Sequence, residues 1–388
     1  MSRGHAVTSV LDQTNPTVNN GPVTECGSPR GRSTRTSMSC GRGRVGSRGK
    51  EMIESSVMPA RLEAFLAEHA GQKATVTGYE PMTGGYSRLM ALATVQWADG
   101  STEKLVLRGD PPPGKSMMDT DRSTEWELLS ALGRANSIPM PAARYFDPTG
   151  DRLGTKCIIL DFVEGRSLQS HLNDCTDGNY GRHTFDLVDT MARVHSIDPD
   201  DVGAAIARPS DWESYISGLI DRFRQADRAH VESNPFLRYV AEWLDANKPA
   251  PLPLRIVHSD FQPANIMVTP DGGHRVIDWE LTHIGDPRED LGYYAVYSAS
   301  SGPSLIMSDP LAFLARYRER TGFGEDAVNL GTLAYFSSLA AISVYAQILG
   351  GAGAMSRGLN TGIMTTYTIN ALTIGHANFM GACLAPAL

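Results

Sequence analysis

The sequence predicts an α+β protein with two lobes, a small β-sheet lobe followed by a larger helical lobe. Up to residue 163, the chain holds short apolar runs, separated by turn residues, that are typical of strands. Beyond residue 163, apolar residues recur with helical spacing, except in one β-rich segment at residues 255–278. We therefore expect residues 58–162 to form the first lobe and residues 163–388 to form the second.

Short strands and two helices are expected in the first lobe. The helices cover residues 60–70 and 123–132, and the strands cover residues 74–79, 89–97, 105–107 and 156–163. The sequence Ala98-Asp99-Gly100 predicts a hairpin turn between the second and third strands. This pattern indicates a small sheet with a helix packed against it.

The second lobe is expected to contain helices at residues 184–196, 212–226, 234–247 and 310–321. Residues 327–356 contain no Asp, Glu, Lys or Arg, as a membrane span would require. Polar residues and several glycines interrupt this stretch, so we interpret it as a buried helix and expect no membrane association.

Residues 1–57 are rich in Gly, Ser, Arg and Thr and contain few residues that could form a core. Such a segment cannot bury enough apolar surface to offset the entropy of ordering it, so we expect a disordered basic tail. An organelle transit peptide, a nucleic-acid-binding arm or a start codon assigned too far upstream remain as alternatives, since Met52 and Met58 could also be starts. Folded structure is expected to begin near Pro59.

The net charge of −8 is unevenly distributed. Residues 1–50 carry eight basic and two acidic side chains, a net charge of +6, so the remainder carries −14. An acidic body argues against nucleic acid as the main partner and would suit a cationic substrate, although acidity also serves solubility. The five cysteines are widely spaced without a C-x-x-C pair, which is typical of a reduced, cytoplasmic chain. The oligomeric state is left open.

The most informative segment is His258-Ser259-Asp260, followed by Asn265 and then by Asp278-Trp279-Glu280. Phosphoryl transfer needs a positioned hydroxyl and neutralised phosphates, and a loop carboxylate such as Asp260 can accept the hydroxyl proton. Magnesium prefers hard oxygen ligands and takes only one or two protein groups in such sites. Asn265 and Asp278 supply an amide oxygen and a carboxylate, and the hairpin between them can bring both to one edge of a cleft.

This motif resembles the catalytic and metal loops of the protein-kinase-like fold and, more narrowly, of the aminoglycoside phosphotransferase (phosphotransferase enzyme) family. With Gly285-Asp286-Pro287 and Asp290-Leu291, it resembles the branch that also occurs fused to acyl-CoA dehydrogenases. The resemblance covers roughly residues 60–345.

The resemblance implies roles for these residues. Asp260 would be the catalytic base, Asn265 and Asp278 would hold magnesium, and His258 would brace the loop. Gln262 stands where a typical protein kinase has Lys, which favours a small-molecule kinase. We interpret three further residues as structural: Asp286 and Asp290 as caps and braces of the next helix, and His195 as a core histidine.

In the first lobe, the resemblance implies a phosphate-covering loop at residues 83–87, with Gly84, Gly85 and Ser87 near the nucleotide. The loop is not G-x-G-x-x-G, and Arg88 replaces the Asn that the family often has there.

The nucleotide-contacting cation, usually Lys in kinases, would be Arg108, which can bind phosphate in a bidentate way. Its partner would be Glu125, with Glu127 as the alternative, because residues two apart on a helix cannot both face inward. Residues 159–165 resemble the hinge between the lobes, where main-chain groups of Asp161 and Val163 would pair with adenine.

These observations predict an ATP- and magnesium-dependent phosphotransferase that moves the γ-phosphoryl group to a hydroxyl of a small molecule. The alternative is a pseudokinase, a module that binds nucleotide without turnover. The helical lobe after residue 290 is expected to line the acceptor pocket. From residue 327 onward, Arg357 is the only charged residue among Asp, Glu, Lys and Arg, so the sequence does not favour a polycationic aminoglycoside as acceptor.

Overall fold

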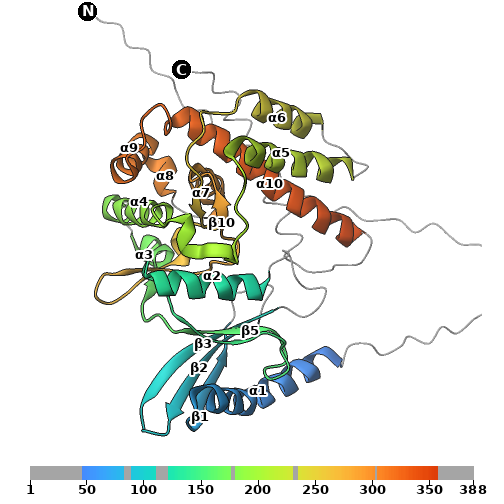
Figure 1. Cartoon of the computed structure of the whole chain (residues 1–388), viewed down its shortest axis with the longest axis vertical. Coiled ribbons are helices and arrows are strands. Elements are labelled where there is room, and N and C mark those ends of the chain that lie inside the picture. Colours follow the sequence, from blue (N-terminus) through green and yellow to red (C-terminus); the bar gives the residue numbers. More distant parts are fainter. Residues whose placement is uncertain are drawn as a thin grey trace, which may run out of the picture. The chain divides into compact units, whose positions relative to one another are not determined.

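The computed structural model describes residues 46–82, 89–110, 121–175, 180–229, 235–301 and 304–356. The chain divides after Lys50, and the elements below belong to the part from Glu51 to Leu388, apart from the beginning of the first helix. In that part, a sheet and a group of helices lie on opposite sides of helix α2 (Figure 1).

The sheet has five antiparallel strands in the order β1-β2-β3-β5-β4. Their bounds are Ala74–Pro81 (β1), Leu89–Trp97 (β2), Thr102–Gly109 (β3), Ala143–Asp147 (β4) and Cys157–Asp161 (β5). The predicted turn at residues 98–100 joins β2 and β3, and Gly100 adopts the positive φ of 85° that such turns require. The edge strand β4 was not predicted.

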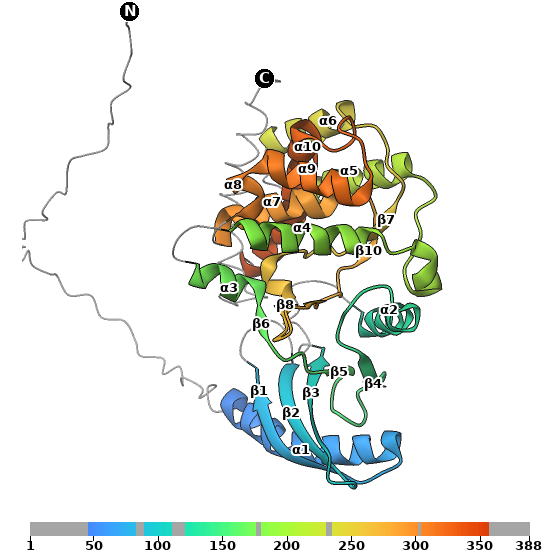
Figure 2. The same ribbon diagram turned by 90° about the vertical axis from the view of Figure 1, so that its left-hand side faces the viewer.

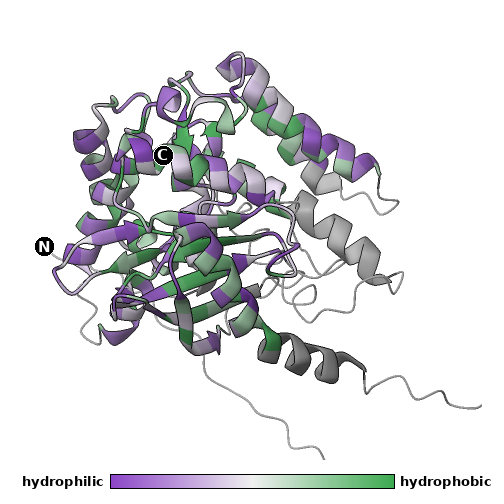
Figure 3. Ribbon diagram, turned by 60° about the horizontal axis from the view of Figure 1, so that its bottom comes forward, coloured by the Kyte–Doolittle hydropathy of each residue, from purple (hydrophilic) through white to green (hydrophobic). Residues whose placement is uncertain are grey.

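Helix α1 (Gly46–Ala70) packs on one face of this sheet through Leu62, Phe65 and Leu66, which are buried with Leu105 and Leu107 of β3. Figure 2 shows α1 lying across the strands, and Figure 3 shows the hydrophobic residues along them. The helix begins at Gly46, earlier than the expected start near Pro59, which lies inside it. A proline weakens a helix but does not force it to begin there.

Helix α2 (Arg122–Ala135) covers the opposite face of the sheet. Alternation along β5 places Ile159 against α1, whereas Ile158 packs with Leu128 and Leu132 of α2. The Asp121 side chain caps α2 by accepting a hydrogen bond from the Ser123 N–H. The same alternation points Arg108 of β3 toward the α2 side, where the candidate site lies.

The helical lobe follows residue 163. Its helices are α3 (Leu168–Asp174), α4 (Gly181–His195), η1 (Pro199–Ala205), α5 (Trp212–Arg228), α6 (Pro235–Ala246), α7 (Arg288–Ser301), α8 (Leu305–Ser308), α9 (Pro310–Thr321) and α10 (Leu330–Ser356). Gly292 lets α7 approach α10 closely, because a Cβ there would lie 2.2 Å from the carbonyl carbon of Phe336. Among the described helices, none combines the length and apolar character of a membrane span.

Two small antiparallel sheets carry the motif residues within this lobe. Strand β7 (Arg255–Val257) pairs with β10 (His283–Gly285), while β8 (Ile266–Val268) lies between β6 (Arg166–Ser167) and β9 (His274–Val276). The short 3-10 helix η2 (Pro263–Asn265) leads into β8. The hairpin β8–β9, with Gly272 and Gly273 at its turn, is the one predicted between Asn265 and Asp278, and it returns the chain to Asp278.

Candidate functional site

The loop of residues 258–265, here called the catalytic loop after the motif that it resembles, follows β7 and is fastened to helix α7 by Asp290. This buried carboxylate accepts hydrogen bonds from the N–H groups of His258 (2.9 Å) and Ser259 (2.8 Å). Ser259 has a left-handed φ of 67°, an uncommon conformation for a residue with a side chain, so the bend in the chain here depends on such fastening. Asp290 therefore braces the catalytic loop, and not its own helix as the sequence suggested.

Asp290 belongs to a buried hydrogen-bonded group with His195 and Tyr317. His195 Nε2 lies 2.9 Å from Asp290 Oδ2, and its Nδ1 lies 2.6 Å from the Tyr317 hydroxyl. Burial favours the neutral form of Asp290, but its interactions with His195 and His258, chiefly the hydrogen bond with His195, outweigh burial and lower the pKa of Asp290. His195 thus has the structural role expected of it.

His258 connects the catalytic loop to the chain before Asp278. Its Nε2 lies 3.0 Å from the Ile277 carbonyl oxygen, and its Nδ1 accepts a hydrogen bond of 3.3 Å from the Asp260 N–H. This arrangement requires the proton on Nε2. The ring also packs against Trp279 at a centroid distance of 5.0 Å.

Asp260 is held by three uncharged donors. Its Oδ1 accepts hydrogen bonds from Gln262 Nε2 (2.7 Å) and the Tyr293 hydroxyl (2.9 Å), and its Oδ2 accepts one from Asn265 Nδ2 (2.7 Å). Burial and the nearby carboxylate of Asp278 raise the pKa of Asp260 above its usual range, against the effect of these hydrogen bonds. A carboxylate in this environment is more basic than one in water.

Asn265 ties the two loops together. Its side chain donates to Asp260, and its main-chain carbonyl accepts a hydrogen bond of 3.0 Å from the N–H of Ile277. Asp278 follows directly and has a left-handed φ of 67°. The structure thus brings together Asp260, Asn265 and Asp278, which the sequence predicted to meet at one edge of a cleft.

On the other side of Asp278 lies a charged cluster. It consists of Arg108, Asp110, Arg122, Glu125, Asp278 and Glu280, drawn from β3, α2 and the loop after β9. Arg108 is 6% exposed, and its Nε lies 3.0 Å from Glu125. Its Nη2 is paired with Asp278 and lies 3.2 Å from Glu280. Although burial disfavours the charge of Arg108, these carboxylates raise its pKa further.

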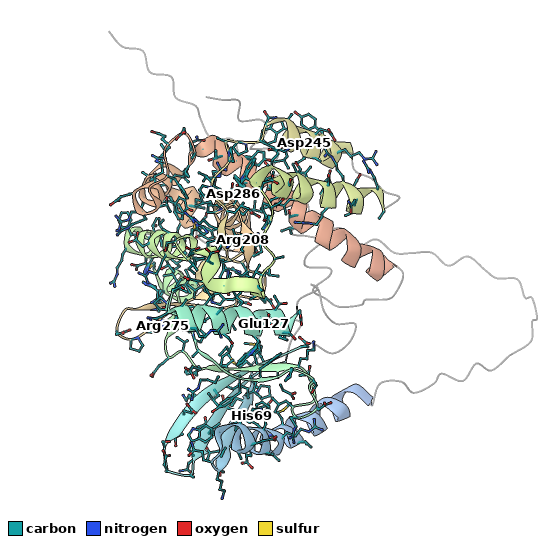
Figure 4. The ribbon with its side chains drawn as sticks, viewed as in Figure 1. His69, Glu127, Arg208, Asp245, Arg275 and Asp286 are labelled. Carbon is teal, nitrogen blue, oxygen red and sulfur yellow. The ribbon has the colours of Figure 1, made fainter. Side chains whose placement is uncertain are left out.

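The sequence left open whether Glu125 or Glu127 pairs with Arg108, and the burial of the two side chains distinguishes them. Glu125 is buried and paired with Arg108, whereas Glu127, labelled on α2 in Figure 4, is exposed. The periodicity of α2 left both open.

At the hinge, the N–H groups of Asp161 and Phe162 are used within the sheet. Asp161 N donates to the Ala142 carbonyl (2.9 Å), and Phe162 N donates to the Lys104 carbonyl (3.2 Å). Val163 lies beyond the end of β5, and among the described residues its N–H makes no such main-chain bond. Gly84, Gly85 and Ser87 of the expected phosphate-covering loop lie outside the described residues.

The residues around Asp278 fit a magnesium ion in charge and donor type. In the charged cluster, two guanidinium groups face four carboxylates, so its described members carry a net charge of −2. Within the described ranges, no three His, Cys, Asp or Glu side chains are grouped as a metal site.

Sequence reasoning missed Arg122 and Tyr293. Arg122 begins α2 and shows no motif, and Tyr293 is one of two adjacent tyrosines after the Asp290-Leu291 pair. Glu280 was visible within Asp-Trp-Glu, but its pairing with two arginines depends on the packing of α2 against the metal loop.

The chain is similar to known proteins in family and in sequence. Residues 80–329 match the model of the Phosphotransferase enzyme family. The chain is 26% identical over 303 residues to the probable acyl-CoA dehydrogenase IBR3 of Arabidopsis thaliana, covering 69% of this chain and 36% of that protein. It is 23% identical over 263 residues to human acyl-CoA dehydrogenase family member 11, covering 61% and 30%. The chain spans about a third of the length of these relatives.

Two solved structures are similar over most of the chain. One is a provisionally assigned aminoglycoside phosphotransferase from Ralstonia eutropha, with a TM-score of 0.62, 19% identity and coverage of 83% of this chain and 97% of that one. The other is the macrolide 2'-phosphotransferase MphH from Brachybacterium faecium, with a TM-score of 0.55, 20% identity and coverage of 80% and 97%. At these identities the similarity concerns the fold, and it confirms the predicted α+β arrangement of a sheet lobe and a helical lobe.

Proposed function

Because the chain belongs to the phosphotransferase enzyme family, we propose that it transfers the γ-phosphoryl group of ATP, with magnesium, to a hydroxyl group of a small molecule. The observation that carries this proposal is the meeting of Asp260, Asn265 and Asp278 beside Arg108. These are the groups that phosphoryl transfer requires: a base, metal ligands and a cation for the phosphates.

Structures of similar fold support a nucleotide and a small-molecule acceptor. One aminoglycoside phosphotransferase was solved with GDP and kanamycin, and another with ADP and hygromycin B. For this chain the acceptor class stays open, and the dehydrogenase activity named for the longer relatives is not part of the proposal.

In the proposed reaction, Asp260 accepts the proton of the acceptor hydroxyl as the hydroxyl oxygen attacks the γ-phosphorus. The bond from the γ-phosphorus to the bridging oxygen breaks, and ADP leaves. Oδ1 already accepts two hydrogen bonds and Oδ2 accepts one, so we assign the proton to Oδ2. Gln262, Asn265 and Tyr293 keep the carboxylate oriented without a positive charge that would weaken it as a base. The raised pKa of Asp260 serves the same end.

The remaining groups would bind the nucleotide. Asn265 donates through Nδ2, so its Oδ1 and the carboxylate of Asp278 are the oxygens we assign to magnesium. When bound, magnesium neutralises charge on the β- and γ-phosphates. Arg108 uses Nε and Nη2 in its ion pairs, so we assign Nη1 to a phosphate oxygen. At the hinge, the Asp161 carbonyl and the Val163 N–H match the amino group and ring nitrogen of adenine.

Nucleotide binding is the first test. Thermal unfolding of the protein is followed while ATP is titrated with and without magnesium. Ligand at about 100 times Kd stabilises the folded state by about 2.7 kcal/mol, and we expect this stabilisation to depend on magnesium. Asp278→Asn should remove the magnesium dependence. Asp271→Asn is the matched control, because Asp271 is exposed at the turn between β8 and β9. No stabilisation of the wild type in either condition would overturn the proposal.

Turnover separates the enzyme from the pseudokinase. ADP release is measured over a panel of hydroxylated small molecules, with Asp260→Asn as the inactive reference. We expect at least one acceptor to stimulate ADP release by the wild type. Tight magnesium-dependent ATP binding without ADP release over a broad panel would favour the non-catalytic module.

A further inference from the structure

Arg122 is a fully buried arginine whose three guanidinium nitrogens contact three different carboxylates. Its Nε lies 3.1 Å from Asp110 Oδ1 and its Nη2 lies 2.7 Å from Glu280 Oε2, while its Nη1 is paired with Glu125. The side chain is 0% exposed. Asp110 follows β3, Glu125 lies in α2, and Glu280 follows the metal aspartate, so one side chain joins three segments.

This placement is costly unless the contacts offset it. Burying a guanidinium removes its hydration, and removing one partner of a buried ion pair leaves an uncompensated charge and is strongly destabilising. Arg122 also opens helix α2, where the helix dipole disfavours a positive charge. Glu125 already has Arg108 as a partner, so neutralising Glu125 does not by itself require Arg122.

Arg122 and Arg108 share two carboxylates. Both contact Glu125, and both contact Glu280 through the same oxygen, Oε2. The four side chains therefore form a closed ring between β3, α2 and the metal loop. Arg108 has a further contact with Asp278, which Arg122 lacks among its described partners.

Nucleotide binding would change the ion-pair partners within this ring. Asp278 would then move from Arg108 to the metal, and Arg108 would turn one nitrogen to a phosphate. Glu280 lies two residues from Asp278, and without a cation its carboxylate would repel the triphosphate. Arg122 contacts Glu280 at 2.7 Å, closer than Arg108 at 3.2 Å, and so can retain Glu280 while Arg108 changes partners.

We propose that Arg122 is a positioning residue for the magnesium–nucleotide site, which it serves by holding Glu280 and Glu125 so that Arg108 is released to the phosphates. The inference rests on the proposed function. It assigns Arg122 no contact with nucleotide. It predicts that the affinity for ATP with magnesium depends on Arg122 beyond any effect on folding.

The first experiment compares Arg122→Lys with Arg288→Lys. Arg288 is also buried and pairs with Asp286 of the helical lobe through two nitrogens, where it also binds the carbonyls of Ala250 and Ala327. Figure 4 labels Asp286 in that lobe. Lys keeps the charge but cannot contact three carboxylates at once. We expect both variants to lose thermal stability, and Kd for ATP with magnesium to rise about tenfold in Arg122→Lys alone.

The second experiment removes both charges of one pair. Replacing a buried ion pair by apolar residues of similar size is often neutral for stability. The double variant Arg122→Met, Asp110→Leu removes such a pair and leaves Arg108 as the described arginine that contacts Glu125 and Glu280, so it tests the proposal in a folded protein if Arg122→Lys alone does not fold. A purely stabilising role predicts that affinity recovers with stability, whereas our proposal predicts that it stays about tenfold weaker.

The outcomes are distinguishable. If the wild type binds ATP with magnesium and Arg122→Lys, or the folded double variant, binds it equally well, the role of Arg122 is refuted and the proposed function stands. If the wild type binds no nucleotide, the proposed function itself fails. An equal loss of affinity in Arg288→Lys would also refute the inference, because the effect would then follow stability.

Discussion

The two aspartates of the site are held in opposite ways. Asp278 is part of a charged cluster, in which guanidinium groups and carboxylates neutralise one another. Asp260 accepts hydrogen bonds from an amide of Gln262, an amide of Asn265 and the hydroxyl of Tyr293, all of them uncharged. One carboxylate is therefore surrounded by charge and the other by neutral dipoles.

The two environments suit two different tasks, exchange of ion-pair partners at Asp278 and orientation of a basic carboxylate at Asp260. Ion pairs in a buried cluster can exchange partners when a divalent cation and a triphosphate arrive, because the total charge is then redistributed. Neutral donors orient a carboxylate without removing much of its basicity. On the proposed function, nucleotide binding and proton transfer should therefore be separable by mutation.

The largest expected effect is that of Asp260→Asn on turnover. Loss of a general base costs about 10²–10⁴ in rate, and the amide cannot accept the proton. Affinity for ATP with magnesium should change little, because the charged cluster is untouched. Steady-state ADP release and equilibrium nucleotide titration measure the two quantities. A variant that loses nucleotide binding together with turnover would show that the two regions are not separable.

Arg108→Met should lower stability and nucleotide affinity, whereas Asp260→Asn should lower turnover. It leaves Glu125 and Glu280 with one guanidinium fewer, and breaking a buried ion pair in this way costs about 3–5 kcal/mol of stability. Nucleotide affinity should also fall, because the cation that we assign to the phosphates is lost. Chemical denaturation and nucleotide titration measure both effects, and Arg108→Lys should recover part of each. Unchanged affinity in a folded Arg108→Met would remove Arg108 from the nucleotide site.

Asp290→Asn should destabilise the protein by about 3 kcal/mol at neutral pH, because buried N–H groups of the catalytic loop lose an ionised acceptor. The folded pKa of Asp290 lies below its unfolded value, so its stabilisation is present above about pH 4 and is lost as pH falls through the folded pKa. Urea unfolding between pH 7 and pH 3 measures this. The difference in free energy of unfolding between wild type and Asp290→Asn should narrow below about pH 4, and a constant difference would contradict an ionised Asp290.

Local patterns identified most of the fold and the ligand-type atoms of the site. Short strand-like runs located β1, β2, β3 and β5. The edge strand β4 was missed because its five residues carry no clear alternation and depend on pairing with β5. The catalytic and metal loops were predictable because their residue types and spacing reflect one reaction. The roles of these residues remain predictions.

The contacts across segments were not predictable in the same way. Arg122 and Glu280 are 158 residues apart in sequence, and nothing local marks them as partners. From the sequence, Asp290 is a residue near the N-terminus of a helix, and only the hydrogen bonds that it accepts from the N–H groups of His258 and Ser259 show that it holds the catalytic loop. Tertiary packing decides such pairings, whereas local sequence decides helices, strands and turns.

The smallest expected effect comes from Tyr293→Phe, which removes one of three donors to Asp260. A single hydrogen bond to a charged group contributes about 1.5–3 kcal/mol, and because Gln262 and Asn265 remain, we expect a loss in kcat of about tenfold with little change in nucleotide affinity. Tyr294→Phe is the matched control: its hydroxyl accepts a hydrogen bond of 3.2 Å from the Leu305 N–H and lies away from Asp260. If both variants lower kcat equally, helix α7 acts through packing alone. If only Tyr293→Phe does, the neutral donors orient the base, and a residue of helix α7 takes part in that orientation.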